Sequence, residues 1–207
     1  MKAMESIARR PGRPLSFDRD KALDAAMRLF WRTGYETTSV ADLTQAMGIT
    51  APSLYTAFHD KETLFLECLR KYTDPAEYKD SALIAETASA REAAQTLLEF
   101  SARWFTQPDA PPGCLVASAA STGSASSERV RAAVADVRKV TQAALQRRVE
   151  EDVHTGKLPE TANACALSSL TVAVIQGMST LARDGASQSS LLELVSTTMA
   201  AWPVSLA

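Results

Sequence analysis

The side chains best suited to chemistry form a cluster of hydroxyl groups in one short segment of the chain. Thr50, Ser53, Tyr55 and Thr56 lie close together, and no Asp, Glu, Lys or Arg occurs between positions 49 and 58. Hydroxyl groups can donate to and accept from base edges and phosphate oxygens, whereas a carboxylate in the same place would repel phosphate. The segment therefore favours contact with nucleic acid over acid, base or nucleophilic catalysis.

The neighbouring residues predict two short helices that are joined by a glycine turn. Thr38 or Ser39 is expected to cap the first helix, because a hydroxyl accepts an unpaired N–H of the first turn. Gly48 supplies the left-handed conformation that ends a helix. Thr50 is expected to cap the second helix, whose first turn tolerates Pro52 because the N–H there has no partner. This is the pattern of a helix-turn-helix, which presents its second helix to the DNA major groove.

The second helix contains no arginine or lysine, so it lacks the usual bidentate contact with guanine. We expect hydroxyl groups and the Ala51 methyl to contact bases, with DNA shape and bridging waters carrying part of the specificity. Lys61 is expected in the first turn of the next helix, where a cation opposes the helix dipole unless a phosphate lies nearby. From these helices, the predicted DNA contacts are Thr38, Ser39, Gln45, Thr50, Ala51, Pro52, Ser53, Tyr55, Thr56 and Lys61.

An arginine-containing arm precedes the predicted helix-turn-helix. Arg9, Arg10 and Arg13 lie in a stretch that has two prolines and no apolar period. Such an arm can enter the adjacent minor groove or follow phosphates, and a plain soluble tail is the alternative. The chain of 207 residues has a net charge of −2, which excludes an indiscriminate nucleic-acid coat protein.

The segment from Phe30 to Leu64 resembles the DNA-binding domain of TetR-family regulators. The resemblance implies phosphate contacts for Tyr55, Lys61 and the hydroxyl near Thr38. Two positions depart from the family, since Ala51 and Ala57 stand where Lys or Arg and His are frequent. The residues that carry the resemblance are Phe30, Gly34, Tyr35, Thr37, Thr38, Ala41, Leu43, Gly48, Ile49, Thr50, Leu54, Tyr55, Phe58, Lys61 and Leu64.

Three further motifs are similar to a branch of that family that begins with a Gly-Arg-Pro arm and includes the copper-responsive ComR-like repressors. They are Gly12-Arg13-Pro14, Pro112-Gly113-Cys114-Leu115 and Gln176-Gly177-Met178. The copper response is implied by this resemblance alone. The three cysteines and two histidines show no chelating spacing, so we expect neither a metal nor a cofactor.

The whole chain is predicted to be all-α, with about nine helices and no strand signal of any strength. We expect a flexible basic arm over 1–14, a helix-turn-helix DNA-binding domain over 15–72, and a helical bundle for effector binding and dimerisation over 73–207. In the TetR family such a bundle usually binds a small molecule, which changes the separation of the two DNA-binding heads.

An uncharged stretch over 161–182 is long enough to span a bilayer. It also carries many Ser and Thr residues and lacks an aromatic belt, so a buried helix at a homodimer interface fits better than a membrane helix. The last helix is expected to join it, which gives a four-helix interface between two copies. The predicted interface residues are Leu170, Val174, Leu181, Leu192, Val195, Met199 and Trp202.

Several residues of the bundle are candidates for a small-molecule site. An alternative for each aromatic residue is an ordinary core position. Cys114 lies at an expected helix start, where the dipole favours a thiolate, so either a redox or electrophile sensor or a buried structural cysteine is consistent with it. The predicted ligand-binding residues are Phe100, Trp104, Phe105, Cys114, Ser118, Gln176 and Met178.

The sequence contains no constellation of acid, base and nucleophile that an enzyme requires, so we predict a protein that is not an enzyme. The absence of an apolar leader and the odd number of widely spaced cysteines indicate a reducing, cytoplasmic location. The favoured function is a homodimeric repressor that an effector releases from a palindromic operator in double-stranded DNA. The alternatives are a regulator without an effector, or an all-α carrier or scaffold without specific DNA binding.

Overall fold

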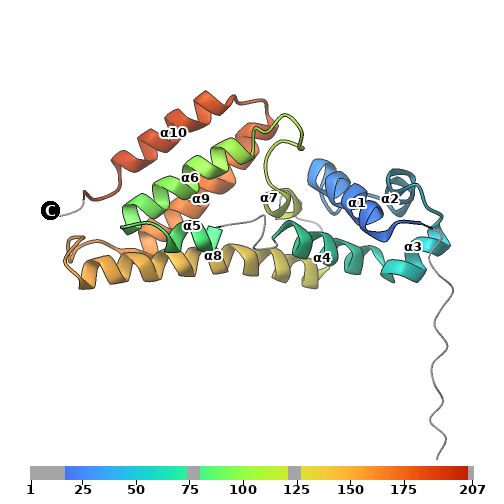
Figure 1. Ribbon diagram of the computed structural model, residues 1–207, viewed down its shortest axis with the longest axis horizontal. Coiled ribbons are helices and arrows are strands. Elements are labelled where there is room, and N and C mark those ends of the chain that lie inside the picture. Colours follow the sequence, from blue (N-terminus) through green and yellow to red (C-terminus); the bar gives the residue numbers. More distant parts are fainter. Residues whose placement is uncertain (1–16, 74–79, 121–126, 205–207) are drawn as a thin grey trace, which may run out of the picture.

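The computed structural model describes residues 17–73, 80–120 and 127–204, and all regular structure in these ranges is helical (Figure 1). The all-α prediction is confirmed, and the described ranges contain ten helices where about nine were expected. The helices are α1 (Arg19–Thr33), α2 (Val40–Met47), α3 (Ala51–Phe58), α4 (Lys61–Tyr72), α5 (Asp80–Ala85), α6 (Ala90–Trp104), α7 (Leu115–Ala120), α8 (Glu128–His154), α9 (Ala164–Arg183) and α10 (Gln188–Ala200).

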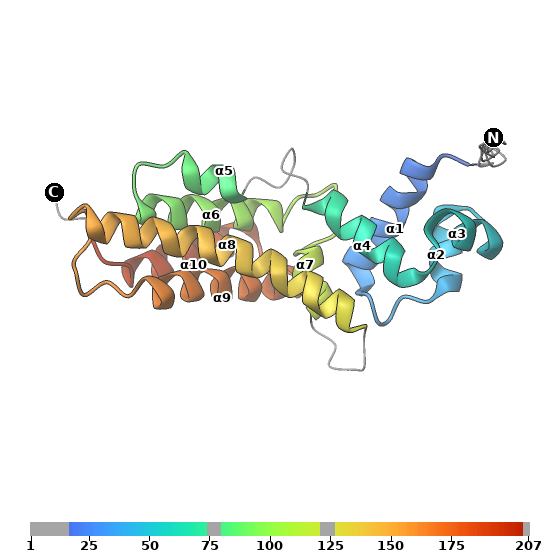
Figure 2. The ribbon, with the colours of Figure 1, turned by 90° about the horizontal axis from the view of Figure 1, so that it is seen from below.

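The molecule is elongated, with a small head at one end and a larger helical body at the other (Figures 1 and 2). Helices α1, α2 and α3 form the outer part of the head, and α4 leads back toward the body. Helix α8 runs along one side of the body and reaches α4, while α7 lies between the head and the body (Figure 2). The head precedes the body in the sequence.

Aromatic residues from α1, from the turn that follows α1, and from α4 form the core of the head. The rings of Phe30 and Phe65 meet edge to face at 5.2 Å, and Tyr35 contacts Phe65 in the same way at 5.1 Å. Phe30 and Phe65 are fully buried. Edge-to-face pairs of this kind add to the free energy of apolar burial, so this core fixes α1 and α4 as the frame on which α2 and α3 rest.

Helix α10 packs on α6 of the same chain, which corrects part of the predicted dimer interface. Val195, Met199 and Trp202 are 3%, 4% and 2% exposed in a single copy, so they belong to the core of the protomer. Arg91 of α6 holds the end of α10 by donating to the carbonyl oxygens of Met199 at 2.8 Å and Trp202 at 2.9 Å. The amphipathic face of α10 was identified correctly, but α6 covers it.

Helix α9 packs against α8 and α6 on one side and leaves an apolar side uncovered. Leu170 and Leu181 are 37% and 44% exposed, and Val174 is half-buried. Among the described residues, α9 is the one helix whose length and composition would allow it to cross a membrane, and 28% of its most apolar window is buried. Its hydroxyl residues Ser168 and Thr171 face inward and bond to carbonyls of their own helix.

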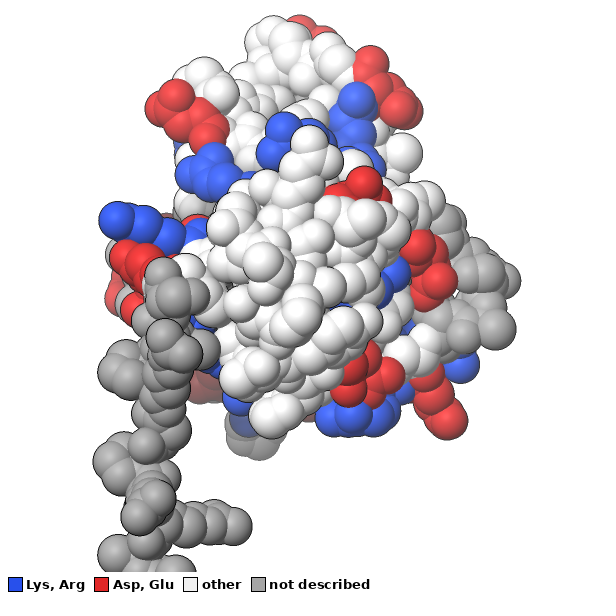
Figure 3. Space-filling view, turned by 90° about the vertical axis from the view of Figure 1, so that its right-hand side faces the viewer, with Lys and Arg blue, Asp and Glu red and all other residues white. Residues whose placement is uncertain are grey.

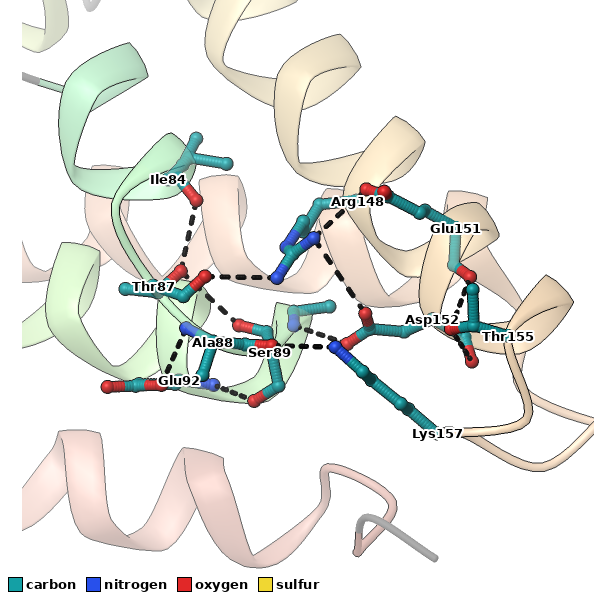
Figure 4. Close-up of polar contacts among 11 residues, drawn as sticks. Ile84, Thr87, Ala88, Ser89, Glu92, Arg148, Glu151, Asp152, Thr155 and Lys157 are labelled. Atoms are coloured by element: carbon teal, nitrogen blue, oxygen red, sulfur yellow. Dashed lines mark hydrogen bonds and ion pairs between the residues drawn. The ribbon is translucent and has the colours of Figure 1, made fainter.

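A buried carboxylate joins α8 to the start of α6 at the far end of the body (Figure 4). Asp152 is 1% exposed and accepts a hydrogen bond from the backbone N–H of Ala90 at 2.6 Å. Arg148 lies beside it and donates to the carbonyl oxygen of Thr87 at 3.0 Å. Lys157 also reaches this loop and donates to the carbonyl of Ala88 at 3.1 Å. These bonds hold the loop before α6 against α8.

We expect Asp152→Ala to lower the free energy of unfolding by about 3 kcal/mol, because it leaves the buried N–H of Ala90 unpaired and removes one of the two carboxylates beside Arg148. Asp136→Ala is the matched control, since Asp136 pairs with Lys139 while 66% exposed and should change stability by less than ~1 kcal/mol. Urea denaturation of both variants measures the difference. Equal losses would mean that Asp152 does not hold this end of the body.

Candidate nucleic-acid interface

Helices α2 and α3 form the predicted helix-turn-helix, and their ends are capped as the sequence indicates. Ser39 and Asp42 make a reciprocal capping box at the start of α2. Gly48 ends α2 in the left-handed conformation with φ 64°, and the Thr50 side chain caps α3. Leu54 of α3 is fully buried, so the inner face of α3 is fixed on the head. We call α3 the recognition helix from here on.

The outer face of the recognition helix is exposed and uncharged. Ala51, Pro52 and Thr56 are exposed, and the Tyr55 side chain is 49% exposed. The end of the molecule where α2 and α3 lie presents a broad face of uncharged residues, with Lys, Arg, Asp and Glu around its edges (Figure 3). This face brings together most of the predicted contacts from the two helices, with Gln45 and Ser39 exposed on α2 and its cap.

Most hydroxyl groups of the recognition helix already take part in hydrogen bonds within the head. Thr50 Oγ1 and Ser53 Oγ lie 2.9 Å apart, and Thr56 Oγ1 donates to the carbonyl of Pro52 at 2.8 Å. The Tyr55 phenol has no such bond to any described residue. Tyr55 is therefore the residue of this helix whose hydroxyl is open to a phosphate oxygen.

Thr38 does not belong to the exposed face, and its predicted role as a direct DNA contact is corrected. Its side chain is 1% exposed, and Oγ1 donates to the carbonyl of Gly34 at 2.6 Å. The same hydroxyl pairs with that of Thr33 at 2.7 Å. Ser39 is the residue that caps α2, and its hydrogen bonds to Asp42 hold the pKa of that carboxyl below its usual range. Thr38 thus positions the turn, while Ser39 lies at the surface.

Arg19 holds the end of the recognition helix, a role that the sequence did not reveal. Its guanidinium lies 4.4 Å from the centre of the Phe58 ring and donates to the carbonyl of Ala57 at 3.4 Å. It also forms an ion pair with Glu67 at 2.6 Å. Arg19 and Glu67 are far apart in the sequence, so no local pattern predicts their contact. His59, which follows Phe58 at the end of the recognition helix, has a positive φ of 69° and turns the chain into α4.

Lys61 lies in the first turn of α4, as predicted, and is half-buried. Its ammonium sits 4.4 Å from the centre of the Tyr35 ring and 3.5 Å from the carbonyl oxygen of Glu36. Burial lowers the pKa of Lys61 because it disfavours the charged form, while the charge of Glu36 opposes this shift. The ammonium is therefore held close to the surface of the head by two weak contacts. The arm residues Arg9, Arg10 and Arg13 lie outside the described residues.

The predicted ligand-binding residues fall into two groups in the body. Phe100 stacks on Trp104 at 5.8 Å, and the Trp104 indole N–H donates to the Tyr72 hydroxyl at 3.1 Å. The Tyr72 hydroxyl in turn donates to the sulfur of the buried Cys114 at 3.5 Å. Trp31 of α1 stacks on Trp104 at 6.4 Å, so this aromatic group reaches the head. Phe105 and Met178 are buried core residues.

Gln176 belongs to the second group and lies apart from these aromatic residues. It lines a cavity of about 20 Å³ between α8 and α9, together with Val116, Val137 and Thr141. That volume is close to the space that a single water needs. The predicted ligand-binding residues therefore do not line a single pocket in this conformation.

A group of hydrogen bonds joins the end of α1 to α7 and α9, which we call the head–body joint. The indole N–H of Trp31 donates to the carbonyl of Gly113 at 3.0 Å, and Ser118 Oγ donates to the carbonyl of Trp31 at 3.0 Å. Arg183 of α9 donates to Ser118 Oγ and, at 3.1 Å, to the carbonyl of Arg32. Ser118, a predicted ligand residue, thus bonds within the protein.

The joint requires glycine at position 113. Gly113 has a positive φ of 79°, and a Cβ there would lie 2.7 Å from the carbonyl oxygen of Ser179. The next residue donates its backbone N–H to the Ser179 hydroxyl at 2.9 Å. The turn before α7 can therefore approach α9 this closely only because residue 113 has no side chain.

The fold and the exposed recognition helix define a helix-turn-helix DNA-binding protein with a helical body. Comparison with known proteins identifies the family. Residues 22–68 match the family described as bacterial regulatory proteins of the tetR family, and residues 91–193 match the tetracyclin repressor-like C-terminal domain. The chain is 36% identical over 200 residues to the transcriptional repressor ComR of Escherichia coli (strain K12), covering 96% of this chain and 95% of ComR.

Two further relatives agree with this result. The repressor BdcR of Escherichia coli (strain K12) is 34% identical over 109 residues, covering 53% of this chain and 55% of BdcR. A solved structure of a cysteine mutant of the TetR-family regulator CifR, complexed with a 26-bp operator DNA, matches with a TM-score of 0.85 and 38% identity. It covers 92% of this chain and all of the CifR chain. This protein therefore belongs to the TetR family and is a DNA-binding transcriptional regulator and not a carrier or scaffold.

We expect Lys61→Met to weaken binding to all DNA sequences alike and to reduce the slope of log Kobs against log salt by about 0.9, the value for one phosphate contact. Lys61→Arg should keep most of the slope because it keeps the charge. Lys139→Met on α8, where the Lys139 side chain is 74% exposed, is the matched control. Titrations at several salt concentrations measure the slopes. An unchanged slope in Lys61→Met would remove Lys61 from the interface.

Proposed function

We propose that the protein is a homodimeric repressor that binds a palindromic operator and is released from it by a small-molecule effector. The observation that carries the DNA-binding part is the exposed, uncharged face of α3, which Arg19 and the capped turn hold in a fixed position on the head. We assign base contacts to Ala51, Pro52, Ser53 and Thr56. Tyr55 and Lys61 contact phosphates, and Thr50, Gln45 and Ser39 complete the surface.

The uncovered side of α9 supports the homodimer. Leu170 and Leu181 are exposed large apolar residues on this side, and Val174 lies between them. Leu192 of α10 is half-buried and completes the proposed surface. A second copy that covers this side would form an interface with twofold symmetry. The same twofold would place two recognition helices about one DNA turn apart, which fits a palindromic site.

The aromatic group between α4, α6 and α1 supports a route from an effector to the head. Phe100 and Trp104 belong to the body, whereas Tyr72 ends α4 and Trp31 lies in α1. A small apolar molecule that entered beside Trp104 would displace Tyr72 and Trp31 together. Because those two residues belong to the two helices that carry the frame of the head, their movement would change the position of the recognition helix.

We expect selection from a pool of random duplexes to enrich a palindrome whose half-sites are about 34–36 Å apart along the DNA, or a multiple of one turn. The full chain is incubated with the pool, and the bound duplexes are sequenced over several rounds. Enrichment of a single half-site without symmetry would contradict the dimer but keep the DNA-binding part. Binding without any sequence enrichment would contradict the proposed operator.

We expect Leu181→Glu to raise the dimer dissociation constant about 100-fold, because two copies of a charge would be buried without partners. Sedimentation velocity over a range of protein concentrations measures the association. Val140→Glu is the matched control, since Val140 is an exposed apolar residue of α8 with 61% exposure. Dimers that persist in Leu181→Glu would show that α9 does not form the interface.

A further inference from the structure

We propose that the recognition helix reads the methyl groups of thymine, so that the operator places A·T pairs opposite Ala51, Pro52 and Thr56. The inference rests on the proposed operator binding and adds the base chemistry that α3 selects. It follows from three properties of the exposed face: the absence of charged donors, the internal hydrogen bonds of Thr56 and of the Thr50–Ser53 pair, and the apolar groups that remain.

Charged donors are absent from the helix itself. No Lys or Arg occurs from position 49 to 58. The Arg19 guanidinium lies at the end of the helix, but it is paired with Glu67 at 2.6 Å and bonded to the carbonyl of Ala57. Guanine presents two acceptors, N7 and O6, in the major groove and is usually read by arginine or lysine. The recognition helix has no such group to offer, so guanine is a poor match for it.

The hydroxyl groups also have few protons to give. The proton of Thr56 is donated to the carbonyl of Pro52 at 2.8 Å. One proton of the pair Thr50 and Ser53 is used in the bond between them at 2.9 Å. Apart from the second proton of that pair and the Tyr55 phenol, which we assign to phosphate, the groups that remain are lone pairs and the apolar surfaces of Ala51, Pro52 and the Thr56 methyl. The face therefore accepts hydrogen bonds and packs against apolar groups more readily than it donates.

An A·T pair matches this combination better than a G·C pair. In the major groove, adenine presents the N6 amino donor, and thymine presents its C5 methyl beside O4. A hydroxyl lone pair can accept from the amino group while a side-chain methyl packs against the thymine methyl. A G·C pair offers an amino donor on cytosine but no methyl, and α3 has no arginine or lysine to meet both guanine acceptors at once.

The test replaces thymine by deoxyuridine, which lacks only the C5 methyl, at each position of the selected operator. We expect a loss of about fourfold in affinity for each contacted methyl, since burial of one such group contributes ~0.8 kcal/mol. Positions outside the half-sites should show no loss. Because adenine keeps its N6 amino group, a Gln45–adenine hydrogen bond would not respond to this change. The experiment therefore isolates the methyl contact.

Protein variants assign each thymine to its residue. Thr56→Ser removes the side-chain methyl but keeps the hydroxyl that bonds to Pro52, and Ala51→Gly removes the methyl at the start of the helix. Each variant should lose its sensitivity to deoxyuridine at one position of the half-site and keep it at the other. Thr155→Ser is the matched control, because Thr155 is exposed on the body and bonds to the carbonyl of Glu151 in the same way.

The possible results separate this inference from the proposed function. Tight binding of the thymine operator with no loss on any deoxyuridine substitution would overturn the inference and leave operator binding intact. Losses that are the same in the Thr56→Ser and Ala51→Gly variants as in the natural protein would also overturn it. A selected operator with G·C pairs opposite the recognition helix would likewise overturn the inference and leave operator binding intact. Failure to bind any operator would overturn both proposals.

Discussion

The position of the head relative to the body depends on the head–body joint. Trp31 and Arg32 at the end of α1 bond to the turn before α7, to Ser118 of α7 and to Arg183 of α9. Backbone carbonyls take part in most of these bonds, so the joint fixes the course of the main chain as well as the side chains. Glycine at position 113 allows this contact, because any Cβ there would meet Ser179. The frame of the head therefore cannot tilt without breaking bonds to α9.

This arrangement links DNA contact, the core of the body and α9 in one structure. Arg183 lies at the end of the helix whose exposed side we assign to the homodimer, so the proposed interface and the joint share α9. Trp31 also stacks on Trp104 of α6, so a change among the body aromatics acts on the same end of α1. In the proposed dimer, both α9 and the body aromatics thus contact the same end of α1.

Local parts of the fold were predictable from the sequence, whereas contacts between distant segments were not. The caps at Ser39 and Thr50 and the glycine turn at Gly48 follow from residues within a few positions of each other. Thr38 and Ser39 are adjacent hydroxyls, and only the packing of the turn decides that Thr38 is buried. The apolar face of α10 that includes Val195 can be recognised from the helical spacing of apolar residues in the sequence. That spacing does not show which other helix covers the face. Arg19 and Arg183 act on partners far away in the sequence, so no spacing reveals them.

Because the recognition helix is uncharged, contacts with phosphates and contacts with bases are expected to come from different side chains. Phosphate contacts supply affinity that is independent of sequence, and base contacts supply specificity. In this head the groups suited to phosphate are the exposed Tyr55 phenol of α3 and Lys61 in the first turn of α4. Lys61 is half-buried against Tyr35, so the phosphate contact that we propose for it would orient the head as well as attract DNA. With few cations close to the bases, wrong sequences gain little electrostatic energy at the recognition helix, and discrimination there depends on shape and on apolar contact.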